Sequence, residues 1–254
     1  MRRSIEEALV VLPTYNEREN VERILTAILA AAPLVDVLVV DDGSPDGTGR
    51  IADRIAADDD RVHVLHRSGK RGLGAAYRAG FRWGIDHGYD VLVEMDADGS
   101  HDPVRLPALL AAVEDADLAL GSRWVPGGSV VGWPLLRQVI SRGGSWYSRF
   151  ALRLKTRDVT GGFRAYRVGA LETIGYEAVA STGYCFQIEM LARVERAGLR
   201  VREIPIEFRD RELGTSKMST GIVIEAMARV TGWAITGLPD IVAAPIREPE
   251  AGHV

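Results

Sequence analysis

The sequence predicts an α/β fold in which one mostly parallel sheet is flanked by helices within a single domain. Short runs rich in Val, Leu and Ile alternate with segments whose apolar residues recur at helical spacing, a pattern typical of doubly wound sheets. With 254 residues, of which 46% are hydrophobic and 26% charged, the chain can bury one sizeable core. Ligands bind to such sheets beyond the carboxyl ends of the strands.

The expected strands are short apolar runs. They cover residues 8–12, 35–40, 62–66, 90–95, 118–120 and 201–206. A helix is expected over residues 18–32, where Asn16 and Glu19 form a variant of the capping box and apolar residues share one face, namely Val21, Ile24, Leu25 and Ile28. Another helix is expected to begin near Pro103.

The most apolar late segment, residues 222–244, is interrupted by Glu225, Arg229, Pro239 and Asp240. A spanning helix needs about 20 mostly apolar residues, so we expect no membrane span. We expect instead an amphipathic helix near residues 220–237, with one apolar side formed by Ile222, Val223, Ala226, Val230, Trp233 and Ala234. A role of this side in the core is favoured over membrane docking, and residues 239–254 are expected to form a mobile tail.

Charge and cysteine content exclude several classes of protein. The formal net charge of −4 argues against a general nucleic-acid binder, which would be strongly basic. Cys185 is the only cysteine, so no intrachain disulfide forms, and the N-terminal residues lack the pattern of a signal peptide. We therefore expect a cytoplasmic protein.

Asp96 and Asp98 follow the expected strand 90–95 directly. Strand alternation would send both carboxylates the same way, so that they converge on one hard cation whose remaining ligands are substrate phosphates. The alternative is that both aspartates only cap the helix near Pro103. Taken alone, this motif leaves the two interpretations with equal weight.

Four further polar clusters also follow expected strands, and together they indicate one shared site. They are residues 13–17, 41–47, 68–74 and 121–123. Within the second cluster, Asp42 can accept two parallel hydrogen bonds from guanine, whereas uracil offers a single N–H at the equivalent edge. An Asx turn is the rival interpretation, and it is stronger for Asp41 and Asp46. Gly72 and Gly74 complete neither the dinucleotide-binding nor the phosphate-loop motif.

The segment 137–167 is strongly basic, with eight Arg or Lys residues against the single acid Asp158. Apolar residues flanked by arginines share one helical face here, as in helices that lie at a membrane interface: Leu136, Val139, Ile140, Trp146, Tyr147, Phe150 and Leu154. An ordinary core-facing helix is an equally weighted alternative, and Gly143 and Gly144 weaken the case for one continuous helix. Arginine forks match phosphate oxygens, so Arg137, Ser141 and Arg142 are candidates for binding an acceptor phosphate.

The ordered motifs resemble glycosyltransferase family 2. The motifs are Pro-Thr-Tyr-Asn-Glu at 13–17, Asp-Asp-Gly-Ser-Pro-Asp-Gly-Thr at 41–48, Gly-Leu-Gly at 72–74, Asp-Ala-Asp at 96–98 and Gly-Ser-Arg at 121–123. Residues 140–143, 158–164 and 208–217 make the chain similar to the dolichyl- or polyprenyl-phosphate mannose synthases within this family. The chain differs at Gly161, where a serine is expected, and it lacks the C-terminal transmembrane helices of some members.

The resemblance implies a GT-A-type, Rossmann-like fold, with a catalytic domain over residues 1–238 that includes a basic acceptor segment at 135–167. It implies a metal-dependent inverting transfer of mannose from GDP-mannose to a polyprenyl phosphate. The implied metal ligands for Mg²⁺ or Mn²⁺ are Asp96, Asp98 and Ser100. The other implied catalytic and nucleotide-sugar-binding residues are Pro13, Tyr15, Glu17, Asp42, Ala97, Arg123, Arg211 and Lys217. Asp158 is expected to orient Arg164 or the acceptor.

Alternatives remain at the level of the sequence. A polyprenyl-phosphate glucosyltransferase that uses UDP-glucose would share the same motifs, because glucose and mannose differ only at C2. A sugar nucleotidyltransferase or a non-catalytic nucleotide-binding protein would share the α/β site. For the favoured activity we expect peripheral association with the cytoplasmic face of a membrane, aided by a separate membrane protein, and no nucleic-acid partner.

Overall fold

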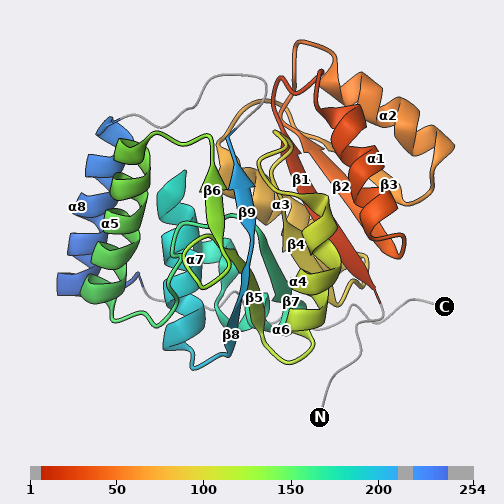
Figure 1. Ribbon diagram of the computed structural model, residues 1–254. Coiled ribbons are helices and arrows are strands. Elements are labelled where there is room, and N and C mark those ends of the chain that lie inside the picture. Colours follow the sequence, from red (N-terminus) through yellow and green to blue (C-terminus); the bar gives the residue numbers. More distant parts are fainter. Residues whose placement is uncertain (1–6, 211–219, 240–254) are drawn as a thin grey trace, which may run out of the picture.

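A computed structural model describes residues 7–210 and 220–239 and contains one seven-stranded sheet (Figure 1). The strand order is β3-β2-β1-β4-β7-β5-β8, and only β7 runs antiparallel to its neighbours. The bounds are β1 Ala8–Thr14, β2 Val35–Asp41, β3 Val62–His66, β4 Val91–Glu94, β5 Leu118–Ser122, β7 Arg164–Arg167 and β8 Val201–Pro205. Two short strands, β6 Ser129–Val131 and β9 Glu207–Arg209, form a separate parallel pair.

Helices cover both faces of the large sheet because its strands alternate in the direction of their apolar side chains. Val10 and Leu12 of β1 pack with α1 Val21–Ala31, α2 Thr48–Asp58 and α4 Leu106–Val113. Leu9 and Val11 point to the other face. There they pack in one core with α3 Leu73–Asp86, α6 Val168–Thr173 and α7 Tyr184–Arg196. Short 3₁₀ turns, Pro103–Arg105 and Tyr176–Ala178, complete these layers. The predicted α/β architecture is confirmed.

The six expected strands are present within two residues of their predicted ends, but β7 has no counterpart in the prediction. This strand has only four residues, and arginines occupy both of its ends. Arg164 is nevertheless fully buried, because it donates hydrogen bonds to the carbonyl oxygens of Val159, Gly161 and Gln187. The hydrogen bonds of Arg164 are satisfied by backbone carbonyl oxygens, so a charged residue occupies a buried strand position. The sequence of β7 therefore lacks the apolar pattern from which a strand is predicted.

The expected capping box of the first helix is wrong. Helix α1 begins at Val21, and Asn20 is its N-cap residue. Asn16 lies earlier, in a loop with a left-handed backbone conformation (φ 59°), and its backbone N–H donates to Ser44 Oγ. The contact with the loop after β2 therefore holds Asn16 outside the helix.

Helix α5, Leu135–Leu152, continues without a break through Gly143 and Gly144, although these glycines had favoured an interruption. It lies beside α8, Thr220–Thr236, at one end of the molecule (Figure 1). Leu152 of α5 is buried. Several other large apolar side chains of this helix are exposed: Leu135, Leu136, Val139, Ile140, Trp146 and Phe150. The expected single apolar face is thus mostly a solvent-facing surface and not a core-facing one.

Helix α8 contributes to the core, as predicted. Val230 and Trp233 are buried, and Ala226 packs partly buried beside them, whereas Ala234 is exposed. The side chains of Ile222 and Val223, and residues 240–254 of the expected tail, lie outside what the structure describes. In the described part of the chain, no helix combines the length and apolar character that crossing a bilayer requires.

Helix α3 approaches the sheet closely through glycines. A Cβ atom at Gly80 would overlap Val11 Cγ1 and would lie 3.3 Å from Val40 Cγ2. At Gly84 a Cβ atom would lie 2.5 Å from Leu92 Cδ2. In contrast, no atom of another described segment lies within 4 Å of a Cβ position at Gly143 in α5. Close packing therefore requires glycine in α3, whereas a larger residue would fit at Gly143 in α5.

The variant Gly80→Ala should lower the free energy of unfolding by about 1–2 kcal/mol, because overpacking against Val11 outweighs the gain in helix propensity. The matched variant Gly143→Ala should raise it by up to about 1 kcal/mol, because alanine favours the helix and meets no atom. Urea denaturation measures both. Shifts of the same sign in the two variants would contradict this account of α3 packing.

Candidate functional site

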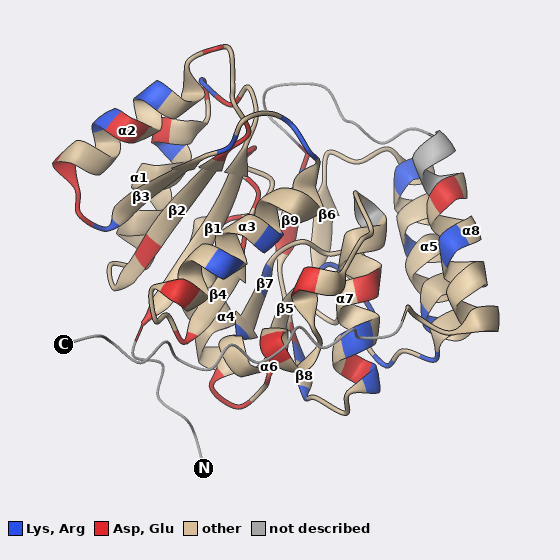
Figure 2. Cartoon of the chain, turned by 180° about the vertical axis from the view of Figure 1, so that it is seen from behind, with Lys and Arg blue, Asp and Glu red and all other residues tan. Residues whose placement is uncertain are grey.

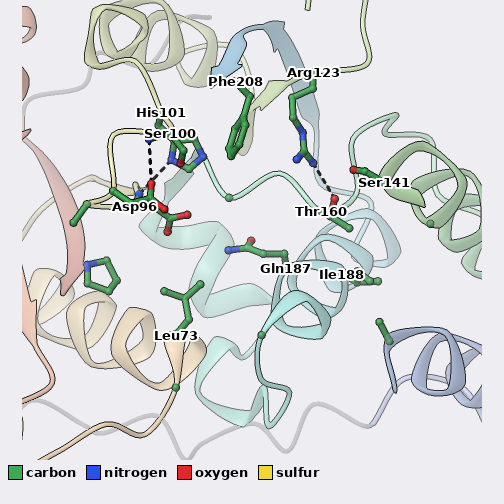
Figure 3. A pocket seen from close by; sticks show the side chains of 18 of the residues that line it. Leu73, Asp96, Ser100, His101, Arg123, Ser141, Thr160, Gln187, Ile188 and Phe208 are labelled. Atoms are coloured by element: carbon green, nitrogen blue, oxygen red, sulfur yellow. Dashed lines mark hydrogen bonds between the residues drawn. The ribbon is translucent and has the colours of Figure 1, made fainter. Parts of the chain in front are cut away.

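A cavity of about 440 Å³ lies beyond the carboxyl ends of β1, β2, β4 and β5 and reaches α5 and α8 (Figure 3). Asp96 and Ser100 lie on one side of it, Arg123 and Ser141 on the other, and Gln187 between them. Most of the expected site residues line this one cavity: Pro13, Tyr15, Glu17, Asp42, Asp96, Ala97, Asp98, Ser100, Arg123, Arg137 and Ser141. Arg211 and Lys217 belong to residues 211–219, which lie outside the described part of the chain.

Asp96 and Asp98 do not cap the following helix. Asp102 does so instead, since its Oδ1 accepts a hydrogen bond of 3.0 Å from the backbone N–H of Val104. Asp98 Oδ1 accepts from the backbone N–H of Ser100, and Asp96 Oδ1 accepts from the hydroxyl of Tyr77. The capping alternative is therefore wrong, and both carboxylates line the cavity.

The oxygens at this end of the cavity suit a hard divalent cation. Ser100 Oγ is buried and has no hydrogen-bond partner among residues 7–210 and 220–239, although it lies two residues from Asp98. Within the described ranges, no group of three or more His, Cys, Asp and Glu side chains forms a complete metal site. A cation held by Asp96, Asp98 and Ser100 would therefore need oxygens from a substrate to complete its coordination. With substrate oxygens as the remaining ligands, Asp96, Asp98 and Ser100 fit Mg²⁺ or Mn²⁺.

The three aspartates at the end of β2 and in the turn after it, Asp41, Asp42 and Asp46, have different roles. Asp41 accepts from Thr14 Oγ1, Ser44 N and Ser44 Oγ, and Asp46 accepts from the backbone N–H and the hydroxyl of Thr48. The bond from the Thr48 N–H, two residues on, confirms the Asx-turn interpretation for Asp46. Asp41 instead accepts from the N–H three residues on and from two hydroxyls, so it is a structural residue of the turn without being an Asx turn itself. Asp42 alone of the three lines the cavity.

Asp42 is buried and is held by two donors. Arg67 Nη1 lies 2.5 Å from its Oδ1, and the backbone N–H of Arg71 lies 3.3 Å from its Oδ2. A carboxylate has about four acceptor positions, so these two bonds leave room for donors of a ligand. The pairing with Arg67 therefore fixes the orientation of Asp42 without using all of its acceptor positions.

The loop after β1 places Tyr15 and Glu17 on the cavity wall. The ammonium group of Lys70 lies 4.3 Å from the centre of the Tyr15 ring, so it brings a positive charge to the same end of the cavity. Glu17 Oε2 accepts a hydrogen bond of 2.8 Å from Asn20 Nδ2. Glu17 thus also stabilises the start of α1.

Arg123, at the end of β5, forms a bidentate pair with Asp158. Its Nε and Nη2 donate to the two carboxylate oxygens over 2.7 and 2.6 Å, and Nη2 also donates to Thr160 Oγ1. Burial alone would raise the pKa of Asp158, but the charge and hydrogen bonds of Arg123 hold it below its ordinary value. Asp158 thus binds Arg123 and not Arg164, contrary to one of its expected roles.

Gly161 lies beside this ion pair. A Cβ atom there would be 3.1 Å from the carbonyl oxygen of Gly121 and 3.4 Å from Asp158 Cγ. A serine at this position would therefore bring its hydroxyl next to the Asp158 carboxylate, to which Arg123 is the side-chain donor among the described residues.

The three expected acceptor residues of α5 do not come together. Arg137 and Ser141 line the large cavity, and Arg137 donates to Asp210 over 2.8 Å with its guanidinium 4.0 Å from the centre of the Trp133 ring. Arg142 lines a second, smaller cavity and stacks over Trp124. One residue corresponds to a turn of about 100° around a helix, so neighbouring side chains face different surroundings.

Several cavity residues have no counterpart among the predicted ones. His101 packs between Phe163 and Phe208, and Phe208 in turn packs against Trp133. Burial lowers the pKa of His101, so its imidazole is neutral and accepts the backbone N–H of Asp96 at Nδ1. Its position directly after Asp96–Ser100 is the signal that would have indicated it.

Gln187 of α7 also reaches the cavity, and its Nε2 donates to the buried Glu94 of β4 over 2.8 Å. Burial raises the pKa of Glu94 to about 7, against the opposing charge of Arg164. No local motif marks Gln187, because it lies about 90 residues after the Asp96 loop in an apolar helix and only the folded sheet brings the two together.

The variant Asp158→Asn should lower the free energy of unfolding at pH 7 by about 3–5 kcal/mol, because it leaves the buried Arg123 without its counter-charge. The native pKa of Asp158 is lowered, so the pair's contribution is complete above the ordinary value of 3.8 and is lost as the pH falls through the native pKa. Denaturation of both proteins from pH 7 into the acid range should show the difference shrinking below pH 3.8. A difference that is constant over this range would contradict the role of the charge.

Comparison with known proteins places this site in a family. The model of glycosyl transferase family 2 matches residues 9–175. A polyprenol monophosphomannose synthase of Mycolicibacterium smegmatis is 55% identical over 96% of this chain and 93% of its own length. An undecaprenyl-phosphate mannosyltransferase of Micrococcus luteus is 57% identical over 89% of this chain and 93% of its own length.

The fold is shared with solved structures of lower identity. Glucosyl-3-phosphoglycerate synthase from Mycobacterium tuberculosis, in complex with Mn²⁺, UDP-glucose and phosphoglyceric acid, superimposes with a TM-score of 0.68 at 22% identity over 92% of this chain and 81% of that one. Its complex with Mn²⁺, UDP and glucosyl-3-phosphoglycerate gives a TM-score of 0.63. The sheet, the ordered motifs along it and the match over residues 9–175 agree, and the chain belongs to glycosyl transferase family 2.

Proposed function

We propose that the protein transfers mannose from GDP-mannose to a polyprenyl phosphate with inversion at the anomeric carbon. The observation that carries this proposal is the division of one cavity into two ends of opposite chemistry. Carboxylates at Asp96 and Asp98 suit a metal-bound diphosphate, and the cation of Arg137 suits an acceptor phosphate. Arg123, which the resemblance assigns to the nucleotide sugar, lies on the same side of the cavity as Ser141, so we assign it to the acceptor phosphate instead (Figure 3). The names of the two relatives, a polyprenol monophosphomannose synthase and an undecaprenyl-phosphate mannosyltransferase, support this substrate class.

The acceptor phosphate would bind at the arginine end. Asp158 fixes the guanidinium of Arg123 from behind, and the Trp133 ring lies against that of Arg137. Both cations are therefore held in place before the substrate arrives, which reduces the entropy lost on binding. Ser141 adds a hydroxyl from the next turn of α5. Roles for Arg211 and Lys217 at the diphosphate remain predictions.

The proposed reaction is a single displacement. An oxygen of the acceptor phosphate attacks the anomeric carbon, the new C–O bond forms on the face opposite the diphosphate, and the old C–O bond breaks with its electron pair leaving on GDP. A divalent cation bound at Asp96, Asp98 and Ser100 would neutralise charge on the leaving diphosphate. The protein's own residues align the acceptor, through Arg123, Arg137 and Ser141, and exclude water from the reacting centre.

No general base is needed in this scheme. The second pKa of a phosphate monoester is about 6, so the acceptor is already largely dianionic near neutral pH. Gln187 of α7 reaches into the middle of the cavity (Figure 3). Its side chain is an amide, which does not act as a base near neutral pH.

Guanine recognition by Asp42 is part of the proposal. Asp42 lines the cavity near the ends of β1 and β2, and its carboxylate can accept from both N1–H and the exocyclic amine of the base. Uracil would make one of these bonds. The choice of GDP-mannose over UDP-glucose thus depends on a single carboxylate whose orientation Arg67 fixes.

Association with the cytoplasmic face of a membrane follows from a lipid acceptor. The exposed apolar side chains of α5, among them Leu136 and Val139, support attachment at the membrane surface by a helix that does not cross it. Assistance by a separate membrane protein remains a prediction.

The central test supplies purified protein with Mg²⁺, a polyprenyl phosphate and labelled GDP-mannose, or UDP-glucose in parallel, and measures label that enters the organic phase. Label should enter from GDP-mannose and should stop on chelation of the metal. Asp98→Asn should lower the rate by at least about 100-fold, the scale of losing one group that stabilises developing charge. The control Asp102→Asn should retain activity, because asparagine also caps a helix and Asp102 does not line the cavity. Transfer from neither donor would refute the proposal, and transfer from UDP-glucose alone would favour the glucosyl alternative.

Asp42→Asn should reduce the preference for GDP-mannose over UDP-glucose by about 10-fold or more, because hydrogen bonds to a charged group contribute roughly 1.5–3 kcal/mol. The ratio of kcat/KM values for the two donors measures this and is insensitive to loss of folded protein. Asp41→Asn removes the same charge one residue away and should leave the ratio unchanged, since Asp41 bonds only within the β1 and β2 loops. An unchanged ratio in Asp42→Asn would show that another group reads the base.

A further inference from the structure

A second cavity of about 140 Å³ lies on the side of α5 that faces away from the large one, and Arg142, Ser145, Trp146 and Arg149 of that helix line it. These positions recur at intervals of three and four and so share one helical face. Trp124, next to Arg123, and Arg157, next to Asp158, complete the wall. The large cavity instead meets Arg137, Ser141, Gly144 and Ser148 of the same helix.

The charge of this second cavity is entirely positive. Its lining contains the three arginines 142, 149 and 157 and no acid. Two acids next to or bonded to Arg157 have other partners: Asp158 pairs with Arg123, and Glu203 accepts from the backbone N–H groups of Arg157 and Asp158. Helix α5 itself carries no acidic residue, and basic positions recur along it (Figure 2). Such a concentration of cations in a small hollow attracts an anion.

Three buried donors of the lining have no hydrogen-bond partner within the described residues: Ser145 Oγ, Trp124 Nε1 and Arg149 Nε. Ser145 is 2% exposed, so water does not readily solvate its hydroxyl. Leaving a buried polar group unsatisfied costs about 1–3 kcal/mol. A phosphate group offers several strong acceptor oxygens and matches both the donors and the arginine forks.

The surroundings of the cavity indicate where that phosphate comes from. Trp146, which lines it, and Phe150 are 66% and 76% exposed, and their rings stack at 5.9 Å. Exposed aromatic side chains beside arginines are typical of helices that lie in the headgroup region of a membrane. A site for a free phosphate ion would gain nothing from them.

We propose that the cavity between α5, Trp124 and Arg157 binds the phosphate of an anionic phospholipid headgroup while Trp146 and Phe150 enter the membrane interface. This site is separate from the one proposed for the acceptor and does not depend on which sugar is transferred. It docks the protein on the lipid surface through α5, the helix that also lines the large cavity.

Vesicles of phosphatidylcholine, alone or mixed with phosphatidylglycerol, test this site by co-sedimentation with the whole protein. The protein should prefer the anionic vesicles. Arg142→Gln combined with Arg157→Gln should weaken this binding by about 30-fold, since a basic residue near an anionic surface contributes about 1 kcal/mol. The matched control Arg50→Gln with Arg54→Gln removes two exposed arginines of α2, at the opposite end of the molecule, and should bind as the unchanged protein does (Figure 1).

The variant Ser145→Ala distinguishes specific binding of a phosphate in this cavity from general electrostatic attraction to an anionic membrane, because it changes no charge and removes one hydrogen-bond donor. It should weaken binding by about 10-fold, the effect of one hydrogen bond to a charged group. Its free energy of unfolding should not fall, since the hydroxyl has no partner to lose. Unchanged vesicle binding by Ser145→Ala, or equal losses in the α5 and α2 arginine variants, would overturn the proposal.

An experiment with inorganic phosphate distinguishes a lipid headgroup from a free phosphate ion as the ligand of this cavity. Titration of the vesicle-bound protein with phosphate alone should release it only at concentrations that screen charge in general, as chloride does at equal ionic strength. Release at much lower phosphate concentration would assign the site to a free ion and overturn the lipid source. Because vesicle binding needs no turnover, this result is independent of the mannosyl-transfer assay.

Discussion

The ion pair between Arg123 and Asp158 is the interaction on which the arrangement of the site depends. Asp158 is fully buried and Arg123 nearly so, and each charge would be costly to bury without the other. Their bidentate geometry joins the end of β5 to the loop before β7, two segments that are 35 residues apart. Because the carboxylate contacts the guanidinium through two of its nitrogens, the cation keeps one orientation at the cavity wall.

A second buried arginine supports the same loop from the other side. Arg164 donates to the carbonyl oxygens of Val159 and Gly161, which flank the loop, and to that of Gln187 in α7. The loop thus lies between two cations, one satisfied by a carboxylate and one by backbone oxygens. This explains how β7, a short antiparallel strand with charged ends, lies between β4 and β5 in the interior of an otherwise parallel sheet. It also explains why Thr160 and Gly162 reach the cavity.

Much of the fold and of the site was predictable from the sequence because both follow from local patterns. The strands are continuous apolar runs, and Asp42, Asp96, Asp98 and Arg123 each come directly after one, so a parallel sheet brings them to the same edge. What escaped prediction depends on contacts that are distant in sequence. Gln187 reaches the cavity only through the packing of α7, and the face of α5 on which Arg142 lies is decided by the helix's rotation against α8 and the core.

Two consecutive glycines, Gly143 and Gly144, lie in the middle of α5. Each costs about 1 kcal/mol in helix propensity relative to alanine, and no atom of another described segment lies within 4 Å of a Cβ position at either of them. The half after them is tied down, by the bond of 2.6 Å between the Tyr147 and Thr231 hydroxyls and by buried Leu152. The half before them carries Arg137 and Ser141 and exposes Leu135, Leu136 and Val139. Glycine pairs are places where helices bend, but here the first half is held as well, because Arg137 pairs with Asp210 and Gln138 donates to the carbonyl oxygen of Trp133. The glycines have a different consequence. Gly144 lines the large cavity, so the side chain that it lacks leaves room for a substrate against the helix.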